Sequence, residues 1–368
     1  MKLGIPEICA VLALVIASPV NVAAGIGGGS PFRQIRIIGD PLKNGIFDVS
    51  VEYGKDGVGW LAYSRVELPK YVSTHLARSM DQGKTWHYVK TVNKSFDHNL
   101  KVRRRNVPGV WRYETPSLLY DPDDIPARRW KLFVQRYFNT TPHKSKNSLF
   151  GAGWIEMRFA SNPAGRWSKP KCLFGKIAKH CDLNINSLHA DLRTTSFYNE
   201  IGSLYHEGVI YLSLDASATP SGLGKWCKRK VVLIASNDHG KNWRFVGTLT
   251  NFKDAKAFGY LTFTGSSLVK RGNRLFLLVT PSGATGFGKK NRAHDGMFVV
   301  EFADIRRATL QRDATGKLLI SKRIKPVFHS GGLSDYHEKN VAGGLLFSEI
   351  NPKAPPDVFK AYSTKLIP

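Results

Sequence analysis

The chain has 368 residues, of which 42% are hydrophobic, a size that fits two ordinary domains or one large all-β architecture. No segment after the first two dozen residues is long and apolar enough for a transmembrane helix, which excludes a protein built from membrane-spanning helices. The formal net charge of +26 favours anionic partners, such as an acidic glycan, nucleic acid or an anionic membrane surface. No nucleic-acid-binding motif accompanies the charge, so nucleic acid is an unlikely partner.

Residues 1–24 have the pattern of a secretory signal peptide. Lys2 gives a positive start, an apolar run follows at 10–17, and small residues precede Gly25. The apolar run is too short to span a bilayer. We therefore expect cleavage after Ala24 and a mature chain that is periplasmic or secreted; an uncleaved anchor is the alternative.

Residues 25–31 are rich in glycine and are expected to form a flexible linker. From residue 32 to residue 368, short apolar or alternating stretches are separated by turn residues, which is typical of β-strands. The strands group into units of four, about 60–70 residues each, a period that is typical of propeller blades. Five inner strands are expected to begin near residues 47, 113, 196, 259 and 336.

Two octapeptides mark turns within this pattern. Residues 79–86 read S-M-D-Q-G-K-T-W, and residues 236–243 read S-N-D-H-G-K-N-W. Aspartate bonds to nearby backbone and glycine accepts a positive φ, so each octapeptide predicts a tight hairpin turn followed by a packed tryptophan. Both resemble the Asp-box (BNR repeat) of sialidases and related β-propellers. That resemblance implies a structural place on the outer strands of a blade.

These patterns predict an all-β fold: a single five-bladed β-propeller over residues 32–368. The last unit lacks a strand, which residues 32–38 can supply, and this N-terminal strand would close the ring and remove a free sheet edge. A six-bladed, sialidase-like propeller is the alternative. Few segments have a helical period, and a short helix or loop is expected within 304–319.

Three of the predicted inner strands begin with a carboxylate: Asp48, Glu114 and Glu200. Inner strands face the central channel, so these side chains are expected to meet at its mouth. Glycoside hydrolysis needs such a set, with one base or nucleophile, one protonated acid and a third group that tunes the pKa of the acid. The alternative is that some of them only form salt bridges with the many lysines and arginines.

The segments around two of these acids resemble five-bladed glycosidases of the arabinanase, xylosidase and invertase group. Asp48-Val49-Ser50-Val51-Glu52-Tyr53 looks like their first blade, and Glu200-Ile201-Gly202-Ser203-Leu204 looks like the strand that carries their acid. The resemblance implies that Asp48 is the base or nucleophile, Glu200 the acid and Glu114 the tuner. It also places His337 in the channel near a bound ion, so a channel Ca²⁺ there is possible, although no other cofactor and no metal-ligand set is expected.

The sequence also departs from this group. The pKa tuner is usually Asp, whereas this chain has Glu114, and the Asn-Asp-Pro motif of invertases is absent because Val49 follows Asp48. A sialidase-like exo-glycosidase is therefore the rival enzyme. It would use Arg65, Arg112 and Arg136 to hold a carboxylate, with a tyrosine nucleophile among Tyr198, Tyr260 and Tyr336.

A third hypothesis is a non-catalytic propeller that binds glycans or other anions on a basic face. Under the hydrolase hypothesis, Trp111 and Tyr198 are candidates for a sugar platform, together with Trp60, for which a place in the aromatic core is the favoured alternative. The sugar, the linkage, the stereochemical outcome and the oligomeric state are left open by the sequence.

Four cysteines are present, and Cys9 lies in the expected signal segment. Cys172 and Cys181 are close enough in sequence to form a disulfide in an oxidising compartment. Cys227 would then be left without a disulfide partner. No spacing of cysteine and histidine predicts a zinc site.

Overall fold

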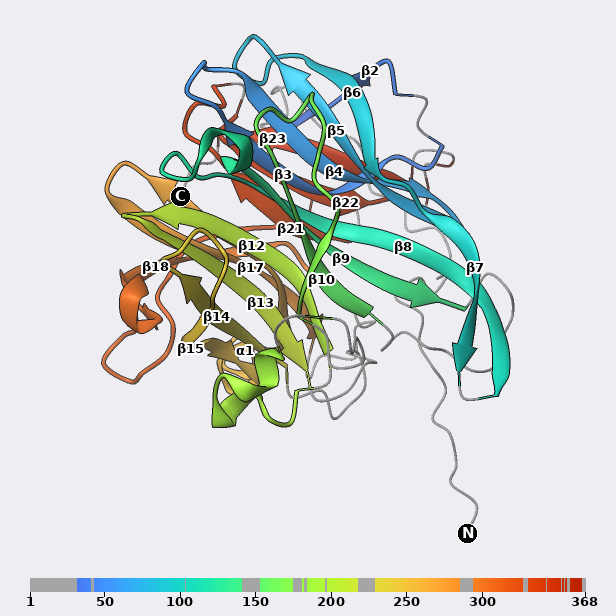
Figure 1. Ribbon diagram of the computed structural model, residues 1–368. Helices are drawn as coiled ribbons and strands as arrows, with labels where there is room; N and C mark the ends of the chain where they lie inside the picture. Colours follow the sequence, from blue (N-terminus) through green and yellow to red (C-terminus); the bar gives the residue numbers. More distant parts are fainter. Residues whose placement is uncertain are drawn as a thin grey trace.

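The computed structural model describes residues 32–365, apart from 41–42, 103, 141–152, 175–180, 182–183, 196, 218–228, 285–293, 327–329, 342, 352, 354 and 356–357. Its strands form five sheets, each of four or five strands (Figure 1). The predicted signal segment, the linker and Cys227 lie outside the described residues. Among the residues that are described, no helix is long and apolar enough to cross a membrane.

We number the sheets as blades one to five. Blade one holds β2 (Ile37–Ile38), β3 (Ile46–Tyr53), β4 (Gly59–Glu67), β5 (Tyr71–Ser79) and β6 (Trp86–Asn93). Blade two holds β7 (Phe96–Val102), β8 (Arg105–Tyr120), β9 (Trp130–Asn139), β10 (Gly153–Ala160) and β11 (Lys171–Phe174). Blade three holds β12 (Phe197–His206), β13 (Val209–Ser217), β14 (Lys230–Ser236) and β15 (Arg244–Asn251).

Blade four holds β16 (Tyr260–Arg271), β17 (Arg274–Ala284), β18 (Met297–Asp304), β19 (Thr309–Leu310) and β20 (Ile320–Ile324). Blade five holds β21 (Ser330–Tyr336), β22 (Leu345–Ile350), β23 (Phe359–Thr364) and β1 (Phe32–Gln34). The described helices are short: α1 (Phe252–Lys256) and the 3-10 turns η1 (Pro126–Arg128), η3 (Ile185–Ser187), η4 (Ala190–Leu192) and η5 (Ile305–Arg307).

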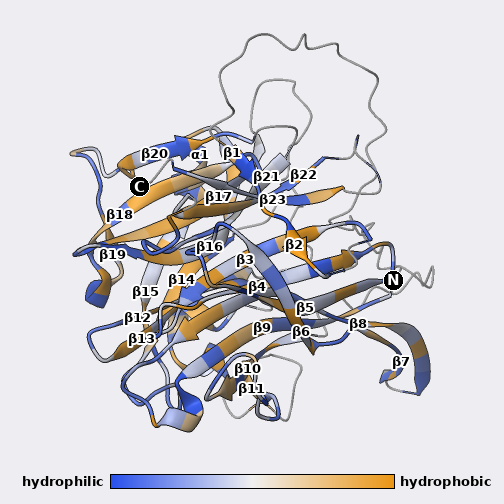
Figure 2. Cartoon of the chain, turned by 90° about the horizontal axis from the view of Figure 1, so that it is seen from above, coloured by the Kyte–Doolittle hydropathy of each residue, from blue (hydrophilic) through white to orange (hydrophobic). Residues whose placement is uncertain are grey.

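The innermost strands of the five blades close a ring. β3 contacts β8, β8 contacts β12, β12 contacts β16, β16 contacts β21, and β21 contacts β3. The apolar core lies between neighbouring sheets, where hydrophobic stretches run along strands such as β17 and β18 (Figure 2). The predicted all-β, five-bladed propeller is therefore confirmed, and the six-bladed alternative is wrong.

The N-terminal strand closes the ring, but it is divided. Residues 32–38 were expected to form one strand; β1 pairs antiparallel with β23 of blade five, while β2 pairs in parallel with β6 of blade one. Between them the Ile35 amide donates to the Ala361 carbonyl at 2.8 Å, and the Ile35 side chain is buried. The segment therefore bridges the first and last blades and covers an edge of each.

The two octapeptides form equivalent hairpin turns, one between β5 and β6 and one between β14 and β15. In the first, the Gly83 amide donates to Ser79 Oγ at 2.8 Å and the Thr85 amide to Asp81 Oδ1 at 2.9 Å. In the second turn, the Gly240 amide donates to Ser236 Oγ and the Asn242 amide donates to Asp238 Oδ1, each at 2.9 Å. Both predicted hairpins are confirmed as turns, and the tryptophan after each is buried.

Candidate active site

A repeated backbone irregularity shapes one end of the channel. Four inner strands contain a β-bulge with a residue of positive φ, namely Asp48 (φ 50°), Thr115 (50°), Glu200 (51°) and Gly265 (57°). Residues other than glycine seldom adopt a positive φ, and such strain gathers at functional sites. Bulges also re-aim side chains next to active sites. The same device therefore presents the side chains of Asp48 and Glu200 from blades one and three.

The register corrects the expectation for blade two. We predicted that Glu114 would occupy the position equivalent to Asp48 and Glu200, but Thr115 does so. The bulge of β8 falls between Glu114 and Ser117, which puts Glu114 one residue before the equivalent position. A one-residue offset reverses the face to which a strand side chain points, so Glu114 joins the site from a different direction.

A small, open pocket lies at these bulges. The carboxylates of Asp48 and Glu200 line it. Hydroxyl groups from four blades line the rest of the pocket: Ser50, Ser117, Ser266, Ser267 and Ser334. Small polar side chains of this kind suit the hydroxyl groups of a sugar, since they donate and accept hydrogen bonds.

Asp48 is held in an environment that disfavours its charge. Its Oδ2 accepts hydrogen bonds from Ser64 Oγ at 2.8 Å and from the Thr115 amide at 3.3 Å, while its buried Oδ1 has no hydrogen-bond partner among the described residues. Burial, followed by repulsion from the carboxylates of Glu114 and Glu200, raises the pKa of Asp48 to about 8. At neutral pH this carboxyl is mostly protonated.

Glu200 accepts hydrogen bonds from a different blade. Its Oε2 accepts hydrogen bonds from the Thr264 hydroxyl and from the Gly265 amide, both on β16 of the next blade. Glu200 is therefore held by donors of blade four, whereas Asp48 is bonded by donors of blades one and two.

Glu114 belongs to the same electrostatic group without lining the pocket. Tyr137 on β9 donates a 2.5 Å hydrogen bond to Glu114 Oε1, and Arg112 Nη1 lies 4.0 Å from the same oxygen. Burial raises the pKa of Glu114, repulsion from Glu200 adds to this, and Arg112 and Tyr137 oppose it. Glu114 thus adds negative charge close to Asp48.

Sequence reasoning missed two buried titratable groups beside Glu200. Asp215 on β13 is fully buried, and burial raises its pKa to about 7, with Arg229 lowering it and Glu200 raising it. His294 is also buried, has a φ of 61°, and its Nδ1 has no hydrogen-bond partner among the described residues. An aspartate inside the apolar run 209–216 was a visible signal for the first. The local sequence gives no comparable signal for His294.

Arg65, the first of the three arginines predicted to hold a carboxylate substrate, pairs with acids of its own chain. Its Nε lies 3.3 Å from Asp40 Oδ1, and its guanidinium also contacts Glu67. Asp40 is buried and accepts a further hydrogen bond from Tyr63 at 2.6 Å. Arg65 is therefore part of a salt-bridge network in blade one.

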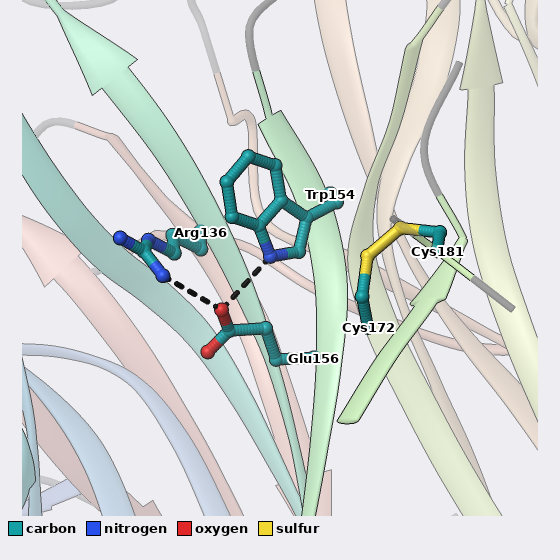
Figure 3. The surroundings of a disulfide bond; sticks show 5 residues. All are labelled: Arg136, Trp154, Glu156, Cys172 and Cys181. Atoms are coloured by element: carbon teal, nitrogen blue, oxygen red, sulfur yellow. Dashed lines mark hydrogen bonds and ion pairs between the residues drawn. A yellow bond between two sulfur atoms is a disulfide. The ribbon is translucent and has the colours of Figure 1, made fainter. Parts of the chain in front are cut away.

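Arg112 and Arg136 also bind groups of the protein. Arg112 donates to the backbone carbonyls of Pro69 at 2.5 Å and Lys70 at 3.0 Å. Arg136 Nη1 lies 3.1 Å from Glu156 Oε1, which also accepts a 2.8 Å hydrogen bond from the Trp154 indole (Figure 3).

Trp111 and Tyr198, two of the predicted sugar-platform residues, are core residues. Trp111 is buried and packs against Trp154 and Phe138, with ring centroids 5.1 Å apart in each pair. The centroid of its ring lies 4.5 Å from the Arg136 guanidinium. Tyr198 is buried, and its hydroxyl donates to Asn186 Oδ1 at 2.8 Å. Neither side chain lines the pocket of Asp48 and Glu200.

His337 lies at the other end of the inner strands. Its Nε2 is 3.1 Å from Glu52 Oε1, and its ring lies 4.7 Å from the ring of Tyr53. Glu52 follows Asp48 by four residues in β3, which corresponds to roughly 13 Å along a strand. The structure therefore separates His337 from the carboxylate pocket, contrary to the expectation that it would share the site.

One group of described side chains has the spacing of metal ligands: Asp121, Asp124 and His239, whose ligand atoms lie within 4.8 Å of one another. The ammonium of Lys131 lies 2.8 Å from a carboxylate oxygen of each aspartate and is fully buried. A cation of the chain itself therefore neutralises this cluster. His239 comes from the turn of blade three, so the cluster also ties blade three to blade two.

The predicted disulfide between Cys172 and Cys181 is present, with Cα atoms 4.7 Å apart (Figure 3). Cys172 lies on β11, opposite Glu156 of β10. The bond therefore ties Cys181 to the outer edge of blade two.

No protein-family model and no curated protein matches the sequence. Solved structures do match the fold. A family 32 glycoside hydrolase from Bifidobacterium adolescentis matches with a TM-score of 0.55 at 9% identity, over 88% of this chain and 55% of that one. A family 32 β-fructofuranosidase from Bombyx mori, determined with sucrose, matches with a TM-score of 0.54 at 10% identity, over 87% of this chain and 59% of that one.

A thermostable family 43 glycoside hydrolase matches over more of its own length, with a TM-score of 0.50 at 10% identity, over 88% of this chain and 90% of that one. The chain spans only 55–59% of the two family 32 proteins. At these identities the likeness shows the fold alone: the chain has the five-bladed propeller fold of these glycoside hydrolases.

Proposed function

We propose that the protein is an exported glycoside hydrolase that acts on a carbohydrate bound between Asp48 and Glu200. One observation carries the proposal: carboxyls from two blades line one pocket, and the surroundings of Asp48 hold that carboxyl protonated. Glycoside hydrolysis uses such a pair, one carboxyl protonated and the other charged. Export rests on the signal pattern of residues 1–24 and places the mature chain in the periplasm or outside the cell.

The environments favour a reversal of the roles that the sequence resemblance implied. Asp48, with a pKa raised to about 8, holds a proton at neutral pH and suits the acid that protonates the leaving oxygen. Glu200, which receives two hydrogen bonds from blade four, suits the charged base or nucleophile. Glu114 keeps the predicted role of tuner, because its charge is one cause of the raised pKa of Asp48.

The charge of the chain favours an acidic glycan, such as a uronate-containing or sulfated polysaccharide. The net charge is +26, and the hairpin of β7 and β8 carries exposed Lys101, Arg104 and Arg105 near its tip. This hairpin extends away from the propeller (Figure 1), and its strand β8 continues into the pocket residues Thr115 and Ser117. A long anionic chain bound in the pocket could therefore also contact the hairpin.

A sialidase-like mechanism is the second candidate, and one contact favours it. The 2.5 Å hydrogen bond between Tyr137 and Glu114 beside Arg112 is a tyrosine–carboxylate pair of the kind such a mechanism needs. The tyrosines predicted for this role make other contacts: Tyr198 donates to Asn186, and Tyr260 donates to Asp295 at 2.7 Å.

The test is a screen of the purified mature chain against aryl glycosides, sialosides, and neutral, uronate and sulfated polysaccharides. Asp48→Asn and Glu200→Gln should each lower turnover by about 100-fold or more, as expected for a group that transfers a proton. Asp56→Asn, in an exposed turn, is the matched control and should retain activity. Unchanged turnover in either pocket variant would rule out the proposed residues.

The same screen separates the alternatives. A sialidase-like enzyme would hydrolyse sialosides only, and Tyr137→Phe would impair it at least as strongly as Asp48→Asn. A non-catalytic propeller would bind an acidic glycan in a salt-sensitive manner and hydrolyse nothing in the panel.

A further inference from the structure

A second buried carboxyl lies behind Glu200. Asp215 on β13 is fully buried, and its Oδ2 accepts a 2.8 Å hydrogen bond from the Thr264 hydroxyl. The same hydroxyl contacts Glu200 Oε2. Thr264, which is also buried, therefore stands between the two carboxyls, and the proposed function gives Asp215 no role.

The Thr264 hydroxyl has one proton and two carboxyl neighbours. It can donate to only one of Glu200 and Asp215, so the other must be protonated and donate to the Thr264 oxygen if both contacts are to be hydrogen bonds. Arg229 Nη1 lies 2.5 Å from Asp215 Oδ2 and 3.1 Å from Thr264 Oγ1. The single positive charge of buried Arg229 beside Asp215 also favours a single negative charge on the pair.

Other charged or titratable groups face this pair and act on its protonation. They are Arg229, at the start of blade three's third strand, His294, ahead of β18, and Asp48 and Glu114 across the pocket. Asp48 is mostly protonated at neutral pH, whereas negative charge on Glu114 repels charge on Glu200 and so disfavours two charges on Glu200 and Asp215. The surroundings on all sides therefore agree with one proton held between them.

We propose that Asp215 stores a proton for Glu200 and exchanges it through the Thr264 hydroxyl. In the exchange, a proton on Glu200 Oε2 moves to Thr264 Oγ1 while the hydroxyl proton of Thr264 moves to Asp215 Oδ2, which leaves Glu200 charged. Threonine ends as a neutral hydroxyl, one carboxyl gains the charge that the other loses, and no solvent proton is needed. Asp215 and Thr264 are thus positioning residues for Glu200; their use in turnover rests on the proposed function, whereas the shared proton does not.

The kinetic test uses Asp215→Asn, Thr264→Val and the conservative Thr264→Ser in the full mature chain. Asp215→Asn removes the repulsion between the charges of Asp215 and Glu200. The acidic limb of the kcat/KM profile should then move to lower pH, by about one pH unit or more. Thr264→Val removes the hydroxyl at nearly constant shape and should lower kcat about 100-fold, as for loss of a proton-transfer group. Thr264→Ser should restore most of it.

A double variant of Asp215 and Thr264 distinguishes proton exchange from a purely structural role of the two residues. In the double variant Asp215→Asn/Thr264→Val, the loss of kcat should equal that of Thr264→Val alone, because the link is already broken. Two independent losses that multiply, or an acidic limb that stays in place in Asp215→Asn, would overturn the proposal.

A measurement without substrate separates this inference from the proposed function. Carbon-13 NMR of the chain labelled at its carboxyl carbons follows each acid during a pH titration, with Glu200→Gln and Asp215→Asn to assign the two signals. If the two carboxyls share one proton, both carbon-13 signals should change over the same pH range. The midpoint of the Glu200 signal should move to lower pH in Asp215→Asn. Coupled signals in a chain that hydrolyses nothing would refute the hydrolase alone, whereas independent signals in an active enzyme would refute the proton store alone.

Discussion

Asp335 of blade five accepts a 2.9 Å hydrogen bond from the hydroxyl of Ser50 in blade one, across the wall of the central channel. The same oxygen accepts a 2.8 Å hydrogen bond from the Val51 amide, and the other oxygen accepts one from Ser267 of blade four at 3.1 Å. Three blades therefore share one buried carboxyl, which is bonded to the pocket residues Ser50 and Ser267. Ser50 also accepts a 3.0 Å hydrogen bond from the Leu118 amide of blade two, which extends the connection to a fourth.

Replacement of Ser50 by alanine should lower the free energy of unfolding by about 1–3 kcal/mol, because it leaves buried polar groups without a partner. Chemical denaturation with circular dichroism measures the loss. Ser348→Ala is the matched control: Ser348 is equally buried in a neighbouring strand, but its hydroxyl has no hydrogen-bond partner among the described residues. Equal losses in the two variants would show that the contact with Asp335 contributes nothing specific.

Replacement of Asp48 by asparagine should stabilise the fold while it abolishes turnover. The pKa of Asp48 rises from its ordinary value of 3.8 to about 8, so the folded chain binds this proton more tightly than the unfolded chain. The stability that the proton provides is present below pH 3.8 and is lost as the pH rises toward 8. At pH 7 the variant should gain about 1–4 kcal/mol, since a tenfold change in proton affinity corresponds to about 1.4 kcal/mol.

Denaturation of wild type and Asp48→Asn at pH 4, 6 and 8 measures this gain. The difference between the two proteins should be near zero at pH 4 and largest at pH 8. Asp56→Asn serves as the control, because Asp56 lies in an exposed turn. A gain that does not change with pH would mean that the charge of Asp48 is not its cause.

The sequence was sufficient to predict the propeller, its five blades, both octapeptide turns and the common location of Asp48 and Glu200 at the inner strands. These features depend on local period and turn chemistry, which a single sequence displays. The offset of Glu114 could not be predicted, because a bulge inserts one residue where the period of two continues on either side.

Contacts between blades could not be predicted from the sequence either. Thr264 of blade four meets Glu200 of blade three from 64 residues away, and nothing in the strand pattern specifies which side chains of neighbouring blades face each other. Arg112 shows the same limit for charge: its sequence position suggested an anion site, but its donors bind backbone carbonyls. The residue type shows which interactions a side chain can make, but not which partner it contacts in the fold.

Removal of the disulfide by Cys172→Ser/Cys181→Ser should cost about 2–3 kcal/mol of stability, the loop-closure entropy of a short loop. The two residues are nine apart, and their bond ties Cys181 to the outer strand β11. Thermal unfolding of the oxidised wild type and the double variant measures the change. A reducing agent should lower the Tm of the wild type toward that of the variant and leave the variant unchanged; a similar shift in both would assign the effect to another cause.

Replacement of Lys131 by methionine should be among the most damaging single changes in the chain. Its ammonium is fully buried between Asp121 and Asp124, and the variant would leave two carboxylates without their cation, a loss of about 3–5 kcal/mol. Lys169→Met, at an exposed position, is the matched control and should change stability little. Thermal unfolding reports both.

The same variant tests whether the cluster is built for a cation of the chain or for a metal ion. Without the ammonium, Asp121, Asp124 and His239 present two carboxylates and an imidazole at ligand spacing, a set that zinc binds readily. Added zinc should therefore raise the Tm of Lys131→Met and leave the wild type unchanged, because Lys131 already fills the cation position. A wild type that zinc stabilises as much as the variant would identify this cluster as a metal site and would contradict the role assigned to Lys131.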